Sequence, residues 1–467
     1  MTNQPLISRR VRRASALFVT IALSLTAAAC SSSSSSGGGK STGGSSASGV
    51  TTISIDCAPP TSKPVPYQQW NADIATFEQQ HPDIKVNSIH TFPCETPALF
   101  TAALAGGTEP NVFYTYFTDK EAVLNANQAA DITSYVTPST VPVLNDFLPS
   151  VISTQKSGGK LYGIPYTNYT MGLIINRKLF KEAGLNPDNP PTTWAQVATD
   201  AEAITKLGNG VEGYGDYSAG NNGGWHFSAE LDALGGSMEN AAGTRANFDN
   251  ALGKEVLQNL HDLRYTDNVM GSTQLLAWGT LQKEMAAGKL GMYIAAPDDI
   301  TYMVQTLGAN YADYSMGPIP SVSGQAAGTL SGGNDYMFNV KDTPAQIKAG
   351  VALVNFLYLT EGQGQFNYAR LKATNQAVGL PEPEMFTGAS LAADNAGKAA
   401  NATMPVSDFT SYLDANVPGD GEPNDAQAVY KVLDTAMASV LTDPNANIDQ
   451  LLSTATSQVN EVLANSQ

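Results

Sequence analysis

The pattern that most constrains the fold is a regular alternation of β and α segments early in the chain. Short β runs cover residues 53–56, 84–89 and 111–116. Large apolar residues recur every three or four positions over residues 67–77, which is the period of an amphipathic helix. A second helix is expected over residues 97–106, between a proline and a glycine. This βαβαβ order predicts an α/β fold with a parallel sheet whose carboxyl edge carries the ligand.

The chain is too long for one hydrophobic core. It has 467 residues, and the strand and helix patterns begin near residue 51. Single cores stop growing at about 250–300 residues, so we expect two lobes. Helix signals recur late in the chain, where Thr343-Pro344 opens one helix and residues 426–441 and 448–464 form two more.

The N-terminus is typical of an export signal. Four arginines within residues 9–13 precede an apolar run over residues 16–29, which is short for a membrane span, since spanning takes roughly 20 residues. Ala27–Ala29 before Cys30 resemble the lipobox of bacterial lipoproteins, although that motif usually has Leu where Ala27 stands. The resemblance implies that Cys30 is lipidated. The alternative is an ordinary secretory signal in which Cys30 has no role.

A flexible tether follows Cys30. The segment from Ser31 to Gly49 is almost entirely Ser and Gly, so it cannot bury enough apolar surface to offset the entropy cost of ordering. A Gly/Ser chain of about twenty residues spans roughly 25 Å. We therefore expect a lipoprotein signal peptide over residues 1–29, followed by a lipid anchor and Ser/Gly tether over residues 30–50.

The net charge narrows the range of partners. The formal net charge is −17, and loss of the four signal-peptide arginines would make it −21. A chain this acidic does not attract nucleic acid or anionic headgroups. The lipid on Cys30 is then the expected contact with the membrane.

Two cysteines, Cys57 and Cys94, remain in the part of the chain that is expected to fold. Each follows the end of a predicted strand, and the ends of neighbouring parallel strands meet at one edge of a sheet. Exported chains favour disulfides, so we predict a bridge between Cys57 and Cys94. The alternative is a pair of reduced, partly buried thiols.

Residues 158–197 contain an ordered series of short motifs. A Tyr-Gly-Ile-Pro turn at 162–165 precedes a strand that ends in Asn176-Arg177. A Leu-Phe-x-x-Ala-Gly helix at 179–184 and a Pro-Pro-x-Thr-Trp segment at 190–194 follow. Thr192 or Thr193 is expected to cap the next helix, and Gly184 to end the preceding one. The series resembles the family 1 extracellular solute-binding proteins, the maltose-binding-protein type that supplies ABC importers.

The resemblance continues through most of the remaining chain. The later segments that match the family in order are residues 285–292, 317–320 and 328–336. It implies a two-lobed periplasmic-binding-protein fold of type II, with discontinuous lobes joined by crossing hinge strands. By analogy, lobe 1 takes residues 51–165 plus 330–400, and lobe 2 takes residues 168–328 plus 402–467.

The resemblance also places candidate ligand residues in a cleft between the lobes. An aromatic face can stack on the CH face of a sugar, and a carboxylate can accept paired hydrogen bonds from its hydroxyl groups. Backbone and amide groups of the returning glycine-rich strand would come close to the solute. The candidates are Tyr116, Asp119, Asn168, Tyr169, Trp225, Asp298, Gly333 and Asn334.

Several of these candidates have a structural alternative. Tyr116 could instead pack in the core, and Asp119 could cap the helix that follows it. Asp298 or Asp299 could cap a helix over residues 300–307. Asp298 also stands where many sugar binders of the family have Trp, so the site favours a short or polar solute over a long malto-oligosaccharide. Paired aspartates and an acidic chain would suit a polyamine or another cation, which is the rival ligand class.

Patterns for catalysis are weak. Gly208-x-Gly210-x-x-Gly213 matches a dinucleotide motif, but it ends a helical pattern instead of following a strand. The four histidines are scattered without metal-site spacing. The acidic segment 414–425 lacks the spacing of a calcium loop and reads as a solvated surface loop. We therefore expect no enzyme activity, no cofactor and no metal; an exported glycan hydrolase is the alternative from another class.

The sequence as a whole predicts a monomeric receptor that lies outside the cytoplasm and is anchored to the cell membrane by lipid. Its expected partners are a small solute, most simply a mono- or oligosaccharide, and the permease subunits of an ABC transporter. Hinge closure of the two lobes would capture the solute.

Overall fold

A computed structural model describes residues 49–91, 94 and 97–465 of the chain. The expected signal peptide, the lipidation site Cys30 and most of the tether lie outside the described residues. Within the described part, no helix is both long and apolar enough to cross a membrane.

The first sheet contains the predicted βαβαβ unit. Its order is β12-β11-β3-β1-β2, and β6 also pairs with β11. β1 pairs in parallel with both β2 and β3, as the alternation predicts. The sheet is nevertheless mixed, because β11 returns from far along the chain and runs antiparallel to β3 and β6. The six strands are β1 (Thr51–Ile55), β2 (Ile84–Ser88), β3 (Val112–Tyr116), β6 (Gly163–Thr170), β11 (Thr329–Phe338) and β12 (Gly419–Gly421).

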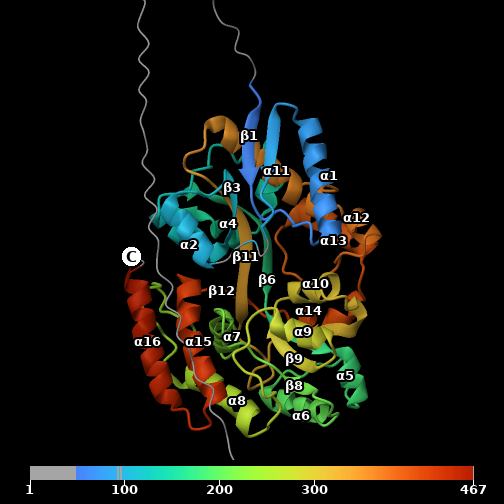
Figure 1. The fold of residues 1–467 in the computed structure, drawn as a ribbon, viewed down its shortest axis with the longest axis vertical. Helices are drawn as coiled ribbons and strands as arrows, with labels where there is room; N and C mark the ends of the chain where they lie inside the picture. Colours follow the sequence, from blue (N-terminus) through green and yellow to red (C-terminus); the bar gives the residue numbers. More distant parts are fainter. Residues whose placement is uncertain (1–48, 92–93, 95–96, 466–467) are drawn as a thin grey trace, which may run out of the picture. The chain divides into compact units, whose positions relative to one another are not determined.

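Helices α1 (Pro64–Gln80) and α11 (Pro344–Tyr358) pack beside the first sheet (Figure 1). Both were predicted from their apolar spacing. α1 buries Trp70, Ile74 and Phe77 on one face, and proline occupies its first turn. α11 begins at Thr343, whose hydroxyl accepts a hydrogen bond from the amide of Gln346 at 3.3 Å. One hydrophobic core joins these helices to β1, β3 and part of β11.

The second sheet has four strands in the order β10-β7-β9-β8. β7 lies antiparallel to β9 and β10, and β8 is parallel to β9. Apolar residues fill both faces, and every residue of β7 and β9 is buried. The four strands are β7 (Gly172–Asn176), β8 (Glu212–Tyr214), β9 (Leu290–Ala295) and β10 (Tyr314–Gly317).

Two C-terminal helices complete the core around the second sheet. They were predicted over residues 426–441 and 448–464, and they occur as α15 (Ala426–Thr442) and α16 (Ile448–Asn465). α15 packs against α7 (Asn222–Ala233) and α8 (Ala251–Tyr265) (Figure 1). Gly224 allows this contact, because a Cβ at Gly224 would stand 2.3 Å from the Cα of Tyr430.

The two sheets are connected by crossing strands. β6 and β11 pair from Ser331 opposite Thr170 to Met337 opposite Gly163, with an irregularity between Asn334 and Asp335. β6 leads directly into β7 of the second sheet after Met171, while β11 enters the first sheet beside β3. These crossing strands join two lobes, each built from separate stretches of the chain, as the resemblance implies.

Local capping signals are also confirmed. Thr193 caps α6 (Trp194–Thr205) by accepting a hydrogen bond from the amide of Gln196 at 3.2 Å. Gly184 follows α5 (Arg177–Glu182) with φ of 78°, a conformation that favours glycine.

The remaining helices and short strands are α2 (Pro97–Gly106), α3 (Lys120–Asn125), α4 (Pro149–Ser153), α9 (Thr280–Ala286), α10 (Asp298–Gln305), α12 (Tyr368–Ala373), α13 (Gly388–Asn401), α14 (Thr410–Ala415), β4 (Lys156–Ser157), β5 (Lys160–Leu161) and the 3-10 turns η1 (Phe117–Asp119), η2 (Pro142–Asp146), η3 (Tyr311–Asp313), η4 (Gly364–Phe366) and η5 (Val406–Phe409).

Candidate functional site

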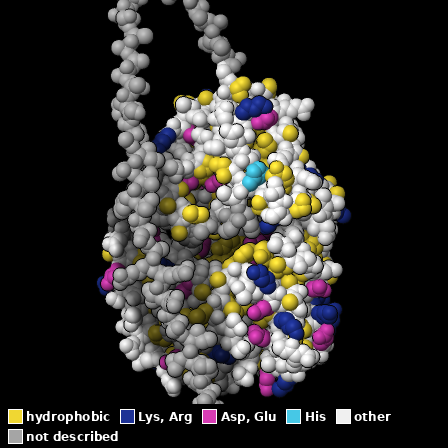
Figure 2. All heavy atoms as spheres, viewed as in Figure 1, with side chains coloured by type: hydrophobic (Ala, Val, Ile, Leu, Met, Phe, Trp, Pro, Cys, Tyr) yellow, Lys and Arg dark blue, Asp and Glu magenta, His cyan; other side chains and the backbone are white. Residues whose placement is uncertain are grey.

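Aromatic and acidic side chains from both sheets interact around the crossing strands. Tyr169 of β6 contacts Trp225 of α7, and its hydroxyl experiences the charges of Glu422 and Asp298. Hydrophobic and acidic side chains occur together near the middle of the face that Figure 2 shows. We use the name interlobe cluster for the residues that are linked to Tyr169 by contact or by charge, directly or through Glu422. Its members are Tyr116, Asp119, Tyr169, Trp225, Asp298 and Glu422.

The centre of the interlobe cluster is the pair of Tyr169 and Trp225. The indole Nε1 of Trp225 donates a hydrogen bond to the Tyr169 hydroxyl at 3.1 Å. Their rings meet edge to face with centroids 5.9 Å apart, a favoured geometry for aromatic pairs. Burial, followed by the charge of Glu422, raises the pKa of Tyr169 well above its usual range. Tyr169 therefore remains a neutral hydroxyl at physiological pH.

Glu422 approaches the same hydroxyl from the end of β12. Its Oε1 accepts a hydrogen bond from the Tyr430 hydroxyl at 3.1 Å. Its Oε2 and the Tyr169 hydroxyl oxygen each lie 2.5 Å from the point where a Cβ on Gly332 would stand. Only glycine leaves room for both oxygens there. Burial, opposed by the Tyr430 hydrogen bond and aided by the charge of Asp119, raises the pKa of Glu422 to about 7.

Tyr116 and Asp119 lie at the end of β3, where the family resemblance placed them. The Asp119 carboxylate accepts a hydrogen bond from the Tyr116 amide at 2.6 Å, and Asp119 is buried. It therefore closes the turn η1 and does not cap α3 with its side chain. Tyr116 is half-buried and meets the ring of Tyr114 edge to face at 5.6 Å. Tyr114 itself belongs to the core of the first sheet.

The paired aspartates at the start of α10 have different roles. Neither caps the helix by a side-chain hydrogen bond, so the expected capping role is wrong. Asp299 is buried and accepts hydrogen bonds from Trp278 Nε1, Gln282 Nε2 and the Tyr293 hydroxyl at 2.8, 2.8 and 2.9 Å. Burial, then the charge of Asp298, raises the pKa of Asp299 to about 7. Asp298 is exposed, and it acts on Tyr169 by its charge.

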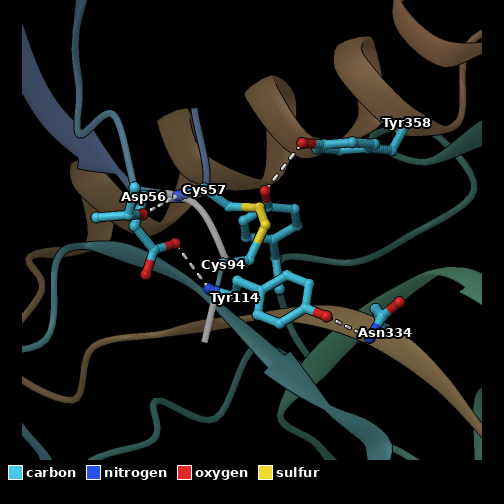
Figure 3. The surroundings of a disulfide bond; sticks show 8 residues. Asp56, Cys57, Cys94, Tyr114, Asn334 and Tyr358 are labelled. Carbon is cyan, nitrogen blue, oxygen red and sulfur yellow. Dashed lines mark hydrogen bonds between the residues drawn. A yellow bond between two sulfur atoms is a disulfide. The ribbon is translucent and has the colours of Figure 1, made fainter. Parts of the chain in front are cut away.

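Three predicted residues lie along the hinge strands and make other contacts. Asn168 donates to the carbonyl of Glu384 at 3.4 Å. Asn334 donates to the Tyr114 hydroxyl at 2.6 Å, as Figure 3 shows. The space beside Gly333 is occupied, since a Cβ there would stand 2.4 Å from the Phe117 ring and 2.5 Å from the Thr167 carbonyl. None of these three contacts joins the Tyr169–Trp225 pair.

The structure joins Cys57 and Cys94 by a disulfide, with Cα atoms 4.6 Å apart (Figure 3). The bridge lies beyond the carboxyl ends of β1 and β2, where the sequence placed it. Next to it, the Asp56 carboxylate accepts a hydrogen bond from the Tyr114 amide at 2.8 Å. Burial raises the pKa of Asp56 to about 7. The disulfide therefore ties down the loops beside the strand that leads to Tyr116.

Sequence reasoning missed Glu422. It lies in the segment 414–425, which was interpreted as a solvated surface loop. In the structure, residues 419–421 form β12 against β11, and Glu422 is half-buried against Tyr430. The short Gly-Asp-Gly strand gave no usable β signal, because glycine and aspartate are depleted in strands.

Among the described residues, no group of three His, Cys, Asp or Glu side chains could hold a metal ion.

A separate depression of about 670 Å³ lies on the first lobe. It is lined by Asp131, Tyr135, Lys160 and Tyr162, among others. Lys160 pairs with Asp131 at 3.3 Å, so the main charges there are already matched. It contains none of the predicted ligand residues.

The structure has the two-lobed fold of the solute-binding proteins. The sequence profile of the bacterial extracellular solute-binding proteins matches residues 61–364, and the chain belongs to this family. The family consists of extracytoplasmic binding components of ABC importers and not of enzymes.

Curated relatives match over part of the chain. The sn-glycerol-3-phosphate-binding periplasmic protein UgpB of Yersinia enterocolitica is 27% identical over 137 residues, which are 28% of this chain and 31% of that protein. The protein of the same name from Rhizobium meliloti is 35% identical over 65 residues, or 14% of this chain and 15% of the relative. The matches thus span a third or less of these relatives.

Solved structures match over most of the described chain. The cyclic α-maltosyl-1,6-maltose binding protein of Arthrobacter globiformis has a TM-score of 0.66 at 19% identity, covering 89% of this chain and 100% of that one. Maltose-bound MalE3 of T. maritima has a TM-score of 0.68 at 18% identity, covering 89% and 100%. UgpB of Mycobacterium tuberculosis in complex with glycerophosphocholine has a TM-score of 0.68 at 15% identity, covering 89% and 99%. At these identities the likeness shows a shared fold.

Proposed function

We propose that this protein captures a carbohydrate at the interlobe cluster and delivers it to the permease subunits of an ABC importer. The observation that carries the proposal is the contact of Trp225 with Tyr169 beside Glu422, at the strands that connect the lobes. An indole face covers the apolar CH face of a sugar ring, and carboxylates and a tyrosine hydroxyl bond its hydroxyl groups. Such a mixture of an apolar platform with a few polar groups is typical of ligand sites.

The connection between the lobes supports capture by closure. We propose that lobe 1 takes residues 51–165 plus 330–400 and lobe 2 takes residues 168–328 plus 402–467. Tyr169 lies on a crossing strand, whereas Trp225 and Asp298 belong to helices of the second lobe and Asp119 to the first. Rigid-body rotation about β6 and β11 would bring these surfaces onto a solute.

We further propose that the protein works as a monomer attached to the outer side of the cell membrane. Cys30 and the Ser/Gly segment 31–49 support this placement. A tether keeps the receptor at a high effective concentration near the permease.

Isothermal titration calorimetry of the purified protein would test which class of solute binds. The panel comprises mono- and disaccharides, glycerophosphocholine and spermidine. Saturable binding of a sugar is expected, and Trp225→Ala should weaken it about tenfold or more, because the variant removes the stacking surface. Tyr135→Phe, which changes a half-buried tyrosine of the separate depression, is the matched control and should leave affinity unchanged.

Two outcomes would contradict the proposal. Binding of glycerophosphocholine or spermidine without binding of any sugar would assign another ligand class. Conversion of a bound oligosaccharide, followed by chromatography, would indicate the exported hydrolase instead of a receptor.

A further inference from the structure

We propose that the solute held at the interlobe cluster carries a protonated amino group and that Glu422 selects for it. This inference rests on the proposed function, since it names the class of carbohydrate that the same site would take. The class is an amino sugar or an amine-bearing glycoside.

The position of Glu422 is set by two contacts that the rest of the fold provides. The Tyr430 hydroxyl holds Oε1 from α15, and pairing of β12 with β11 places the residue at the hinge. Oε2 and the Tyr169 hydroxyl oxygen each lie 2.5 Å from one point above Gly332, so they are no more than about 5 Å apart. A donor group placed between these two oxygens could bond both of them. Glu422 is thus a directed acceptor at the centre of the cluster.

Three carboxylates act on this centre by their charge. Glu422 and Asp298 raise the pKa of Tyr169, and Asp119 raises that of Glu422. These acids come from three separate segments: Glu422 follows β12, Asp298 begins α10 and Asp119 ends η1. Their convergence is therefore a property of the tertiary structure and not of one acidic run in the sequence.

Two basic side chains, Lys120 beside Asp119 and Lys398 of α13, have other partners. Lys120, which follows Asp119, donates to the carbonyl of Lys156 at 3.0 Å and pairs with Glu121 at 3.2 Å. Lys398 of α13 pairs with Asp394 at 2.8 Å. Neither Glu422 nor Asp298 forms an ion pair with a basic side chain in the part of the chain that the structure describes, so these two carboxylates are available to a ligand.

A protonated amine matches the charge of these carboxylates better than a neutral sugar does. An ammonium group has three donors and a positive charge, so it can bond Glu422 and reduce the repulsion among the carboxylates. The Trp225 ring offers a cation–π contact next to it. A phosphate group would meet carboxylates of its own sign. Asp298, which stands where many family members have Trp, exchanges a stacking surface for a further negative charge.

Calorimetry with matched ligand pairs would test the inference on the full mature chain. The pairs are glucosamine with glucose and N-acetylglucosamine, and their disaccharide counterparts, with spermidine as a cation that is not a sugar. The amino member of at least one pair should bind tenfold or more tightly than its neutral partners. Glu422→Gln keeps the shape but removes the charge, and it should reduce this preference to threefold or less.

Matched variants and distinct outcomes separate the two proposals. Glu384→Gln removes an exposed acid outside the cluster and should keep the full preference. Equal binding of neutral and amino sugars, or an unchanged preference in Glu422→Gln, would overturn the inference and leave the carbohydrate proposal intact. Binding of spermidine alone would overturn the carbohydrate proposal. Absence of binding by every ligand in the panel would overturn both.

Discussion

The indole Nε1 of Trp225 donates a hydrogen bond to the Tyr169 hydroxyl at 3.1 Å, which joins a helix of the second lobe to a strand that crosses between the lobes. The bond orients the indole ring against Tyr169, and the charges of Glu422 and Asp298 act on the Tyr169 hydroxyl. A position that family resemblance marks as aromatic thus acquires a defined orientation from a tyrosine that is distant in the sequence.

This pair should show energetic coupling. Tyr169→Phe removes the acceptor and Trp225→Phe removes the donor, so each variant should lose about 1 kcal/mol of unfolding free energy. The double variant should lose less than the sum, because the same hydrogen bond is lost in both single variants. Urea unfolding of the four proteins measures the coupling. Strictly additive losses would mean that the hydrogen bond adds nothing to stability.

Gly224 should be intolerant of any side chain. In Gly224→Ala, the new Cβ would meet the Tyr430 backbone at 2.3 Å from Cα and 2.6 Å from the carbonyl oxygen, which forces α7 and α15 apart. Overpacking of this kind costs about 1–3 kcal/mol. Gly421→Ala is a matched control, since nothing lies within 4 Å of its Cβ position. Thermal unfolding should show a clear loss for the first variant and little change for the second.

Stability should decrease as pH rises through the neutral range, partly because of Asp232. Burial, followed by the charge of Asp420, raises the pKa of Asp232 to about 8 from an ordinary value of 3.8. The folded state therefore holds this proton more tightly than the unfolded state does. The resulting stabilisation is complete below about pH 4 and is lost as pH rises to about 8, at up to about 1.4 kcal/mol per pH unit.

Asp232→Asn isolates this effect. The variant should flatten the decline in unfolding free energy between pH 5 and pH 8, because the amide cannot ionise. Urea unfolding at both pH values measures the difference. Asp249→Asn, at an exposed position, should leave the slope unchanged. An identical slope in Asp232→Asn and in the unmodified protein would show that Asp232 is not the group responsible.

The disulfide should contribute substantially to the stability of the first lobe. Cys57 and Cys94 are separated by 37 residues, and cross-linking a loop of that length stabilises the fold by about 3–4 kcal/mol in the chain-entropy model. Reduction should lower the unfolding temperature, and the Cys57→Ser, Cys94→Ser double variant should no longer respond to reductant. If alkylation without reductant labels both thiols in the native protein, the bridge is absent.

Lipidation of Cys30 remains a prediction that concerns residues outside the described part of the chain. Cys30→Ala should release the protein from membranes with solute binding intact, because the anchor is then lost while the lobes are unchanged. Fractionation of cells expressing each form, followed by calorimetry on the released protein, is the measurement. A variant that still sediments with membranes would contradict the lipid anchor.

Much of the fold could be predicted because its signals are local. The 3.6-residue apolar spacing of α1, the proline that opens α11 and the threonine that caps α6 each act within a few residues. The antiparallel entry of β11 into the first sheet could not be predicted from its own residues. Its pairing partners, β3 and β6, lie far earlier in the chain.

The candidate site was predictable only in part. Family resemblance placed Tyr116, Asp119, Tyr169 and Trp225 in one cleft. Tyr169 and Trp225 are in contact, and the binding of a solute by these four residues stays a prediction. Nothing in the sequence indicated that Asp299 accepts hydrogen bonds from Trp278, Gln282 and Tyr293. Such contacts depend on how helices and strands pack against each other, which a local pattern does not specify.

The sequence by itself therefore determined the class of fold, the order of its elements and the family. Backbone preferences and apolar periodicity act over short distances, so they can be read along the chain. Only the tertiary structure decided that Glu422 lies beside Tyr169 and that both oxygens occupy the space that a Cβ at position 332 would take. The relative positions of these residues depend on packing among β12, β11, β6 and α15. These elements are distant in the sequence and meet only after the chain has crossed between its two lobes.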